Sequence, residues 1–259
     1  MTTALTIKAL DKVPMIGPGD DLATIIVDAL ADNDLTVENG DVLVLAQKIV
    51  SKSEGRLLDL NTVLPSKRAE EIAHATDKDP RLVEAILAES KSVLRRVPGV
   101  LITEHLRGWI MANAGIDASN VASSDGEDNV LLLPLDPDKS CEDLCEQLYV
   151  RTRKEVGVLI NDSFGRPWRL GTTGVALGAA GLPSLWDRRG EKDMFGRELQ
   201  VSQQAVADEL AAAASLVQGQ GAEGRPIALI RGLEFGANEN APSRPAADLI
   251  RDISEDLFR

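Results

Sequence analysis

Two short apolar runs constrain the fold of this chain more than any other feature. The runs are DVLVLA at residues 41–46 and VGVLINDS at residues 156–163, and each carries consecutive apolar side chains instead of alternating apolar and polar ones. Short apolar runs bounded by polar residues are typical of strands that are buried inside a sheet. We therefore expect two buried strands here, and further strands at LTIKAL (5–10) and PIALIRG (226–232).

Helical patterns separate these strands along the chain. They cover residues 22–31, 65–76, 80–90, 136–155, 202–219 and the end from residue 245. Asp20 or Asp21 can cap the first helix, and Pro65 suits the first turn of the second. The other segments are expected as a polar loop at 47–56, two short strands around a turn at 107–108, and a glycine-rich extended segment at 172–181. Because strands and helices mix without a regular βαβ repeat, we expect an α+β fold, not a doubly wound sheet.

The length and charge of the chain argue against several classes of protein. Its 259 residues suffice for one large domain or two small ones. The net charge of −13 argues against nonspecific binding to nucleic acid and against attachment to an acidic membrane surface. We expect no signal peptide and no membrane span, because no basic start precedes an apolar core and no apolar run reaches about 18 residues. With Cys141 and Cys145 as the only cysteines, we expect no disulfides and a reducing, cytoplasmic location.

Two patterns resemble functional motifs without meeting their structural requirements. The run GQGAEG at 219–224 has the glycine spacing of a dinucleotide-binding loop, but it follows an expected helix and precedes a strand, which is the wrong order. It is either a glycine helix cap or a loop whose backbone contacts a ligand. No P-loop pattern occurs. Cys141 and Cys145 share an expected helix face and are interpreted as core thiols, while His74 and His105, the only histidines, have no neighbours that would make a triad.

Two segments of this acidic chain carry a local excess of positive charge. Residues 91–107 hold four cations and one acid, and residues 162–200 hold six cations and five acids together with seven glycines. Any single arginine here can be explained by ion pairing in a loop. Arginines next to flexible glycine backbone are also typical of sites that bind phosphate or carboxylate groups. Arg166 and Arg169, in NDSFGRPWR, are therefore candidates for binding an anionic substrate.

Two aspartates lie where functional residues concentrate, at strand ends and in the loops that follow them. Asp117 follows an expected strand in NAGIDASN, and Asp162 ends the run GVLIND, next to Ser163. Together with the amide of Asn120, these side chains offer the hard oxygen ligands that Mg²⁺ or Mn²⁺ prefers, and such ions bind phosphates. The alternative, in which both aspartates only cap turns, stays open at this point.

Six motifs in order make the chain resemble the F420 gamma-glutamyl ligase family. They are VLAQKIVSKSEGR, NAGIDASN, LLPLDPD, NDSFGRPWR, GRELQVS with AVADELAAAASLV, and PIALIRGL. Each motif is weak alone, but their order is specific, and the resemblance covers residues 12–233. Some members of the family carry a C-terminal flavin-binding, nitroreductase-like domain; the expectation here is a single module over 1–259 without it, with two lobes that could be intertwined.

The resemblance implies a two-lobed α+β fold, a homodimer with its active site in a groove at the interface, and GTP as the energy donor. It also implies Mg²⁺ or Mn²⁺, with two ions expected and K⁺ as a further candidate. The implied reaction joins the α-amine of L-glutamate to a carboxylate of F420-0, forms GDP, and then adds a γ-linked glutamate.

The resemblance assigns roles to individual residues. Lys52 is expected to neutralise phosphate charge, Asp117 and Asp162 to bind one metal ion, and Ser163 and Gln220 to face a second. Gln220 is neutral, so if the second ion needs a negative charge there it should bind more weakly. Ser163 replaces an expected threonine, which is a mild departure from the family pattern. The implied nucleotide contacts are Val13, Pro14, Met15, Ile16, Gln47, Lys52, Asn120, Gln218, Gly219, Gln220, Gly221, Ala222, Glu223, Gly224 and Arg225.

A carboxylate resists attack by an amine until one of its oxygens becomes a leaving group, and transfer of the γ-phosphoryl group would supply one as an acyl phosphate. This transfer depends on positioning and charge neutralisation, so no nucleophilic side chain is required. The rival interpretations are a ligase of the same family with another acid acceptor, a metal-dependent nucleotide phosphohydrolase, and a nucleotide-binding regulator without turnover.

Overall fold

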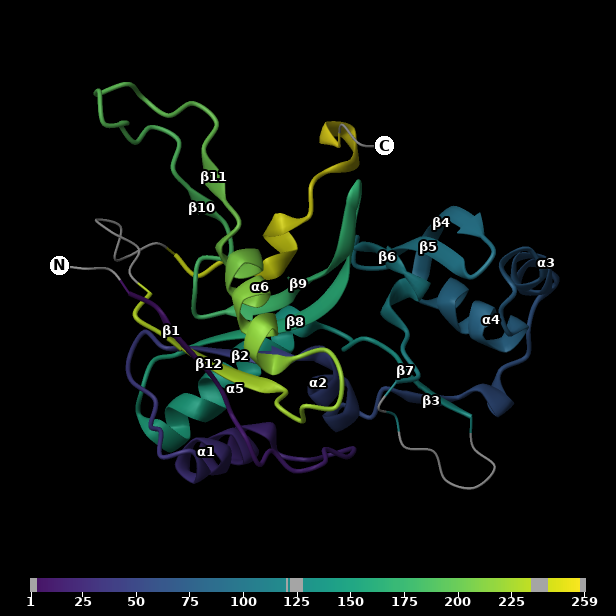
Figure 1. The fold of residues 1–259 in the computed structure, drawn as a ribbon, viewed down its shortest axis with the longest axis horizontal. Helices are drawn as coiled ribbons and strands as arrows, with labels where there is room; N and C mark the ends of the chain where they lie inside the picture. The colour runs from purple at the N-terminus through teal and green to yellow at the C-terminus, as the bar shows by residue number, and fades with distance from the viewer. Residues whose placement is uncertain (1–3, 120, 122–127, 234–241, 257–259) are drawn as a thin grey trace.

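A five-stranded mixed sheet forms the centre of the larger lobe (Figure 1). The structure is a computed structural model that describes residues 4–119, 121, 128–233 and 242–256. The strands lie in the order β1 (Thr6–Ala9), β12 (Ile227–Arg231), β2 (Val42–Ala46), β8 (Gly157–Arg166) and β9 (Arg169–Ala180). Only β2 and β8 pair in parallel. The two apolar runs are thus neighbouring inner strands, as the sequence predicts.

Helices cover both faces of this sheet, which explains why the inner strands are apolar throughout. Helices α1 (Leu22–Asp32) and α5 (Pro137–Thr152) pack on the face that holds Leu43 and Leu45, and α6 (Val206–Gln218) packs on the face that holds Val42 and Val44. Figure 1 shows α6 on one side of the strands and α1 with α5 on the other. The expected α+β class is confirmed.

Two glycines of β9 allow helices to approach the sheet closely. A Cβ atom at Gly174 would lie 2.3 Å from the backbone oxygen of Ala211 in α6, and one at Gly178 would lie 2.3 Å from the backbone carbon of Pro137 in α5. Both distances are shorter than any normal contact. The glycine-rich run at 172–181 is therefore a packing feature on both faces of the sheet.

The smaller lobe has a hydrophobic core of its own. It consists of α3 (Lys67–Thr76), α4 (Pro80–Ala88), the sheet β4 (Ser90–Val97), β5 (Val100–His105) and β6 (Ile110–Ala112), and the strand pair β3 (Leu57–Asp59) with β7 (Asn129–Leu131). Ile72, Val83, Ile86, Leu101 and Val130 form the centre of this core. Figure 1 places the lobe at one end of the long axis.

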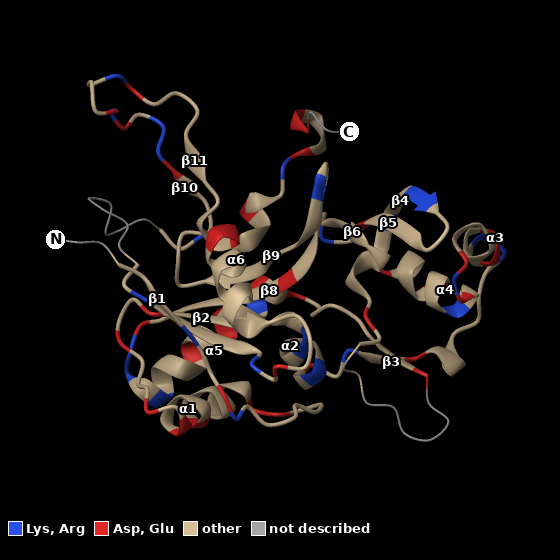
Figure 2. Cartoon of the chain, viewed as in Figure 1, with Lys and Arg blue, Asp and Glu red and all other residues tan. Residues whose placement is uncertain are grey.

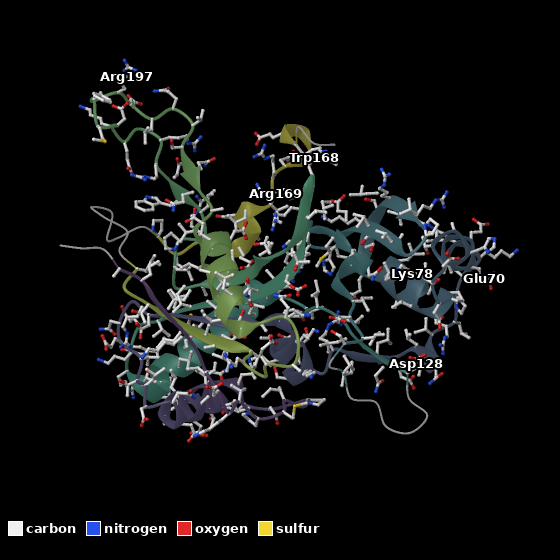
Figure 3. All side chains as sticks on the ribbon, in the orientation of Figure 1. Glu70, Lys78, Asp128, Trp168, Arg169 and Arg197 are labelled. Atoms are coloured by element: carbon white, nitrogen blue, oxygen red, sulfur yellow. The ribbon has the colours of Figure 1, made fainter. Side chains whose placement is uncertain are left out.

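Two hairpins extend from the larger lobe with exposed apolar side chains near their ends. Strands β8 and β9 continue past the other strands to a tip at Pro167 and Trp168, and we call this hairpin, residues 162–173, the arm. Trp168 and Leu170 are 82% and 99% exposed. The second hairpin starts from β10 (Trp186–Asp187) and β11 (Gln203–Gln204) and ends near Met194 and Phe195, which are also exposed. Figure 3 shows Trp168 and Arg197 at the far ends of the two hairpins.

Several local predictions need correction. Residues 47–53 form a helix, α2 (Gln47–Ser53), where a polar loop was expected, because Ile49, Val50 and Ser51 are buried. Strand β4 was missed, and the C-terminal segment contains two 3-10 turns, Ala246–Leu249 and Ile253–Glu255, instead of a regular helix. Strand β8 does not end near Asp162 but runs on into the arm.

Other local predictions hold, with one further correction. Asp21, and not Asp20, caps α1 by accepting a hydrogen bond from the backbone N–H of Thr24. Ser66 caps α3, so Pro65 lies before the cap and not in the first turn, where it was expected. Cys141 is buried and Cys145 is half-buried on α5, as core thiols. Among the described residues, no helix is long and apolar enough to cross a membrane.

Candidate active site

A cavity of about 560 Å³ lies at the edge of the central sheet, between the N-terminal turn, α2, β8 and the loop after α6. Its volume is within the range of small-molecule sites. Segments that are far apart in the sequence meet here, and most of the residues expected to bind nucleotide or metal line the cavity: Val13, Pro14, Met15, Ile16, Gln47, Lys52, Asp162, Ser163, Gln218, Gly219, Gln220, Gly221, Ala222, Glu223, Gly224 and Arg225.

The sheet itself places Asp162 at the cavity. The parallel pairing of β2 and β8 ends at the pair Ala46 and Asn161, where β2 gives way to helix α2. Asp162 is the next residue on β8, beyond the last residue of its parallel neighbour. Asp162 was expected at the end of its own strand, which is wrong, because β8 continues past it. The expected end of the neighbouring strand, β2, is correct. The departure of β2 opens the edge at which the carboxylate lies.

Asp117 is fixed by a second set of contacts. Its backbone N–H and C=O pair with Leu131, the last residue of β7. Its Oδ1 accepts a hydrogen bond of 2.7 Å from the backbone N–H of Ser119, and its Oδ2 accepts one of 2.9 Å from the Ser119 hydroxyl. The carboxylate is thus held in one orientation.

Lys48 is a residue of this site that the sequence analysis missed. Its Nζ lies 2.8 Å from Oδ2 of Asp117, 2.6 Å from the Ser119 hydroxyl and 3.2 Å from the Ser119 carbonyl oxygen. Lys48 and Lys52 are four residues apart on α2 and both line the cavity, and Figure 2 shows positive charge on this helix. The i, i+4 spacing in KIVSK was the available signal, but it carries no meaning in a segment expected to be a loop.

The charges at this wall influence one another. Burial raises the pKa of Asp162 to about 6, and the nearby Asp117 acts in the same direction, while Lys48 opposes it. Burial would also raise the pKa of Asp117, but hydrogen bonds from Lys48 and Ser119 outweigh it, so this pKa is below its usual value. The pKa of Lys52 is lowered, first by burial and then by Lys48. The wall thus combines the Asp162 carboxylate with two ammonium groups, and the Asp117 carboxylate is paired with one of them.

The oxygen atoms at this wall fit a divalent cation. Asp117 already holds a cationic group, the Lys48 ammonium, and Asp162 lies close enough to both for their charges to affect its pKa. The Ser163 hydroxyl and Oε1 of Gln220 are 2.7 Å apart and add neutral oxygen ligands. Within the described residues, no three His, Cys, Asp or Glu side chains form a metal cluster. This set suits Mg²⁺ or Mn²⁺, which commonly takes one or two carboxylates and completes its shell with phosphate oxygens and water.

The loop after α6 is held in place by a buried amide. Gln218 donates from Nε2 to the backbone oxygens of Val44 and Pro226, each at 3.2 Å, and its Oε1 accepts from Asn161 at 2.9 Å. Gly219 caps α6 with a positive φ of 82°. The run GQGAEG follows a helix and precedes β12, as expected, so it is both a helix cap and a lining of the cavity.

Some predicted site residues lie elsewhere or have other partners. Arg166 and Arg169 face each other near the tip of the arm and do not line the cavity of this chain. Figure 3 shows Arg169 in the arm, near Trp168. Arg225 forms an ion pair with Asp11 at 3.0 Å, and the buried Gln47 accepts a hydrogen bond from Ser51 at 2.9 Å. Asn120 lies outside the described residues.

The two positive segments do not meet at the cavity. Arg95 and Arg96, on β4 of the smaller lobe, line a separate recess. Figure 2 shows positive charge on this strand. Arg188 and Arg189 form ion pairs with Glu191 and Asp187 in the second hairpin. For this second pair of arginines, local ion pairing is the right interpretation.

Comparison with known proteins agrees with these features. The sequence model of the family described as F420-0:Gamma-glutamyl ligase matches residues 11–232. This segment runs from the N-terminal turn to the residue after β12, and so contains every described element that contributes to the cavity.

Three curated relatives carry the name "Coenzyme F420:L-glutamate ligase". The chain is 44% identical to the relative from Methanothermobacter thermautotrophicus, over 98% of this chain and 99% of that protein. It is 44% identical to the relative from Methanopyrus kandleri, over 96% and 97% of the two chains. It is 42% identical to the relative from Haloarcula marismortui, over 98% and 96%. The chain belongs to the F420-0:gamma-glutamyl ligase family.

Proposed function

We propose that the chain is a GTP-dependent ligase that joins the α-amine of L-glutamate to a carboxylate of F420-0 and then adds a γ-linked glutamate. The names of its relatives support the acceptor and the amino acid. The observation that carries the use of GTP is the wall of the cavity, where Lys48, Lys52 and Asp162 lie, together with Asp117, which pairs with Lys48. Acids and lysines in such an arrangement are suited to a magnesium-bound triphosphate.

The proposed chemistry activates the acceptor as an acyl phosphate. The acceptor carboxylate attacks the γ-phosphorus of GTP, the bond to the β,γ-bridging oxygen breaks, and GDP leaves. The neutral amine of glutamate then attacks the acyl carbon, loses a proton as the amide bond forms, and inorganic phosphate leaves. Lys48 and Lys52 supply positive charge next to the phosphates, where negative charge shifts during the first step. Preorganised charge of this kind, without a covalent enzyme intermediate, is sufficient for phosphoryl transfer.

Asp117 and Asp162 would hold a first divalent ion, and Ser163 with Gln220 a second. Bound there, Mg²⁺ or Mn²⁺ would polarise phosphate oxygens and neutralise their charge. Burial keeps the Asp162 carboxylate partly out of water, which strengthens its interaction with a cation. K⁺ stays a further candidate that no feature of the described residues singles out.

We propose that the enzyme works as a homodimer in which the arm contributes to the partner's site. The arm carries Arg166 and Arg169 away from the cavity of its own chain, beside the exposed side chains of Trp168 and Leu170. Exposed apolar patches of this kind often mark interfaces. A second copy that buries the arm would bring these arginines to an anionic substrate.

The cytoplasmic location also stays a prediction, to be tested by cell fractionation.

One assay tests the proposal. The purified protein is incubated with F420-0, L-glutamate, GTP and Mn²⁺, and products are identified by mass spectrometry. We expect F420 with one and two glutamates, and GDP formed only when glutamate and acceptor are both present. GDP formation without either substrate would favour the phosphohydrolase, and ligation to another acid would favour a different acceptor within the same family.

A further inference from the structure

The ion pair between Lys48 and Asp117 lies where a metal ion is expected. Nζ of Lys48 is 2.8 Å from Oδ2 of Asp117, and the two side chains are only 26% and 39% exposed. Ser119 holds both partners, since its hydroxyl lies 2.6 Å from Nζ and 2.9 Å from the same Oδ2. Three groups thus form a closed cluster around Oδ2 of Asp117, and one of them, Lys48, lines the cavity.

A divalent cation at Asp117 must compete with this ammonium group. The other carboxylate oxygen, Oδ1, already accepts a backbone hydrogen bond from Ser119 at 2.7 Å. A cation on Oδ2 would lie within a few ångströms of Nζ, where like charges repel strongly because water is partly excluded. The charge of Lys48 also acts on Asp162 and Lys52, so Lys48 lies near both of these groups as well as near Asp117.

We propose that Lys48 is a positioning residue that couples metal binding to nucleotide binding. Its ammonium group holds Asp117 until the phosphates of the nucleotide offer it another partner, and the carboxylate then becomes available to the ion. The metal half of this inference rests on Asp117 as a ligand, and the nucleotide half rests on the function proposed above.

Thermodynamic linkage gives this arrangement a measurable consequence. Binding the ion alone requires separation of the Lys48–Asp117 pair with no compensation for the ammonium group. Binding it with a nucleotide lets Lys48 exchange a carboxylate for a phosphate. Each ligand therefore promotes the other, and coupling between sites typically changes affinities by a factor of 5 to roughly 150. Without Lys48 most of this cooperativity should disappear.

A purely structural role for the pair predicts different behaviour. In that case Lys48 would only tie the loop of residues 113–119 to α2. Its removal would loosen Asp117 and weaken metal binding in every condition. The two interpretations thus predict opposite signs for the effect on the affinity of the metal alone.

The experiment measures free Mn²⁺ by electron paramagnetic resonance during titration of the protein, with and without saturating GDP and after correction for Mn²⁺–GDP in solution. The parent is compared with Lys48→Met and Lys48→Arg. Lys52→Met is the matched control, because it removes the same charge one helical turn away and leaves the Lys48–Asp117 pair in place. Circular dichroism and the unfolding temperature establish that each variant is folded.

Without nucleotide, Lys48→Met should bind Mn²⁺ about tenfold more tightly than the parent. Lys48→Arg, which keeps the charge, should bind it no more tightly than the parent, and Lys52→Met should show a smaller gain than Lys48→Met. The factor by which GDP tightens Mn²⁺ binding should be about tenfold larger in the parent than in Lys48→Met.

One result would overturn this inference and leave the proposed function intact. In it, Lys48→Met binds Mn²⁺ no more tightly than the parent, while GDP still increases the affinity of the parent for Mn²⁺. A gain for Lys52→Met equal to that for Lys48→Met would overturn it too, because general charge would then suffice. If GDP does not alter Mn²⁺ binding by the parent, the coupling fails together with the proposed use of GTP.

Discussion

At the residue scale, the site depends on charged side chains whose close approach and partial burial cost free energy. Asp162 is largely removed from water and close to a second carboxylate, and its pKa is raised to about 6 for that reason. Groups with perturbed pKa values in a cavity are often functional, because a protein rarely retains such strain without use. Two predictions concern single residues here.

The first prediction is that Asp117→Ala and Asp162→Ala each abolish ligation while the fold survives. Asp162 lines the cavity and Asp117 pairs with Lys48, which lines it, so each variant removes a candidate oxygen ligand without removing a core side chain. We expect a loss of at least about a hundredfold in kcat. The measurement is product formation at several Mn²⁺ concentrations, with the unfolding temperature as the control. Near-normal activity at low Mn²⁺ would contradict the metal assignment.

The second prediction concerns Lys52, which lines the cavity and is partly buried. A positive group beside the phosphates stabilises the transition state more than the ground state, so its loss appears in turnover. Lys52→Met should lower kcat by about a hundredfold, and Lys52→Arg should recover part of it. Steady-state kinetics tests this, with thermal unfolding as a check of the fold. A variant as fast as the parent would place the nucleotide elsewhere.

At the scale of elements, close packing between helices and the sheet can be tested at one glycine. Gly174 lies against the backbone of Ala211 in α6, so Gly174→Ala should force the helix and β9 apart. Overpacking of this kind costs about 1–3 kcal/mol. Gly165→Ala in the arm is the matched control, because a Cβ there meets nothing within 4 Å. Chemical denaturation should show a loss for Gly174→Ala alone, and equal stabilities would disprove the argument.

Glu89, at the end of α4, pairs with Arg56 in the segment that enters the smaller lobe, and it should make stability depend on pH. Its Oε2 lies 3.7 Å from Nε2 of the buried His105 and 3.0 Å from Nη2 of Arg56, whose Nε binds the Leu133 carbonyl oxygen. His105 and then Arg56 lower the pKa of Glu89 below its usual 4.5. A carboxyl group with a lowered folded pKa stabilises the protein above its unfolded pKa, and this stabilisation is lost as pH falls through the folded pKa.

Glu89→Gln should therefore lower the free energy of unfolding at pH 7 by about 2 kcal/mol. The difference from the parent should shrink as pH falls below about 4.5. Urea titrations at pH 7, 5 and 4 measure it. A difference that stays constant with pH would show that the effect of Glu89 is steric and not electrostatic.

The elements that the sequence predicts well are those whose pattern is set by the core. The runs at 41–46 and 156–163 are buried on both faces, and α1, α5 and α6 have the periodicity of helices that cover them. Helix α2 was missed because it is seven residues long and is stabilised by burial of Ile49 and Val50 against distant elements. Lys48 was missed with it. The arm was missed because its outer half pairs only with itself, and its residues carry no core pattern.

The candidate site also has features that could be predicted from the sequence and features that could not. The resemblance to the family, which rests on six motifs in order, indicated most of the residues that line the cavity. The contact of Asp117 with Lys48 joins residues 69 positions apart and depends on how β7 anchors one loop beside α2. No local pattern encodes such a contact. Arg166 and Arg169 lie away from the cavity because β8 is long. The number of charged residues in a segment does not predict the length of a strand.

At the scale of the whole molecule, the two hairpins of the larger lobe expose apolar side chains that no other part of the described chain covers. Trp168 and Leu170 in the arm, and Met194 and Phe195 in the second hairpin, are among the most exposed large apolar residues of the described chain. Figure 1 shows both hairpins leaving the larger lobe on the side opposite α1. Exposure of this kind is costly in water unless a partner covers it.

The last prediction is that the arm holds the homodimer together. The variant with Trp168→Asp and Leu170→Asp places two charges where we expect an apolar interface, so it should shift the protein from dimer to monomer in light scattering. Ligation should fall with it, because Arg166 and Arg169 could no longer reach the partner's site. Leu64→Asp is the matched control, since Leu64 is 90% exposed on the smaller lobe and lies outside both hairpins. That variant should stay dimeric and active. A parent that is monomeric and fully active would refute the homodimer, and a dimeric double variant would show that the arm is not its interface.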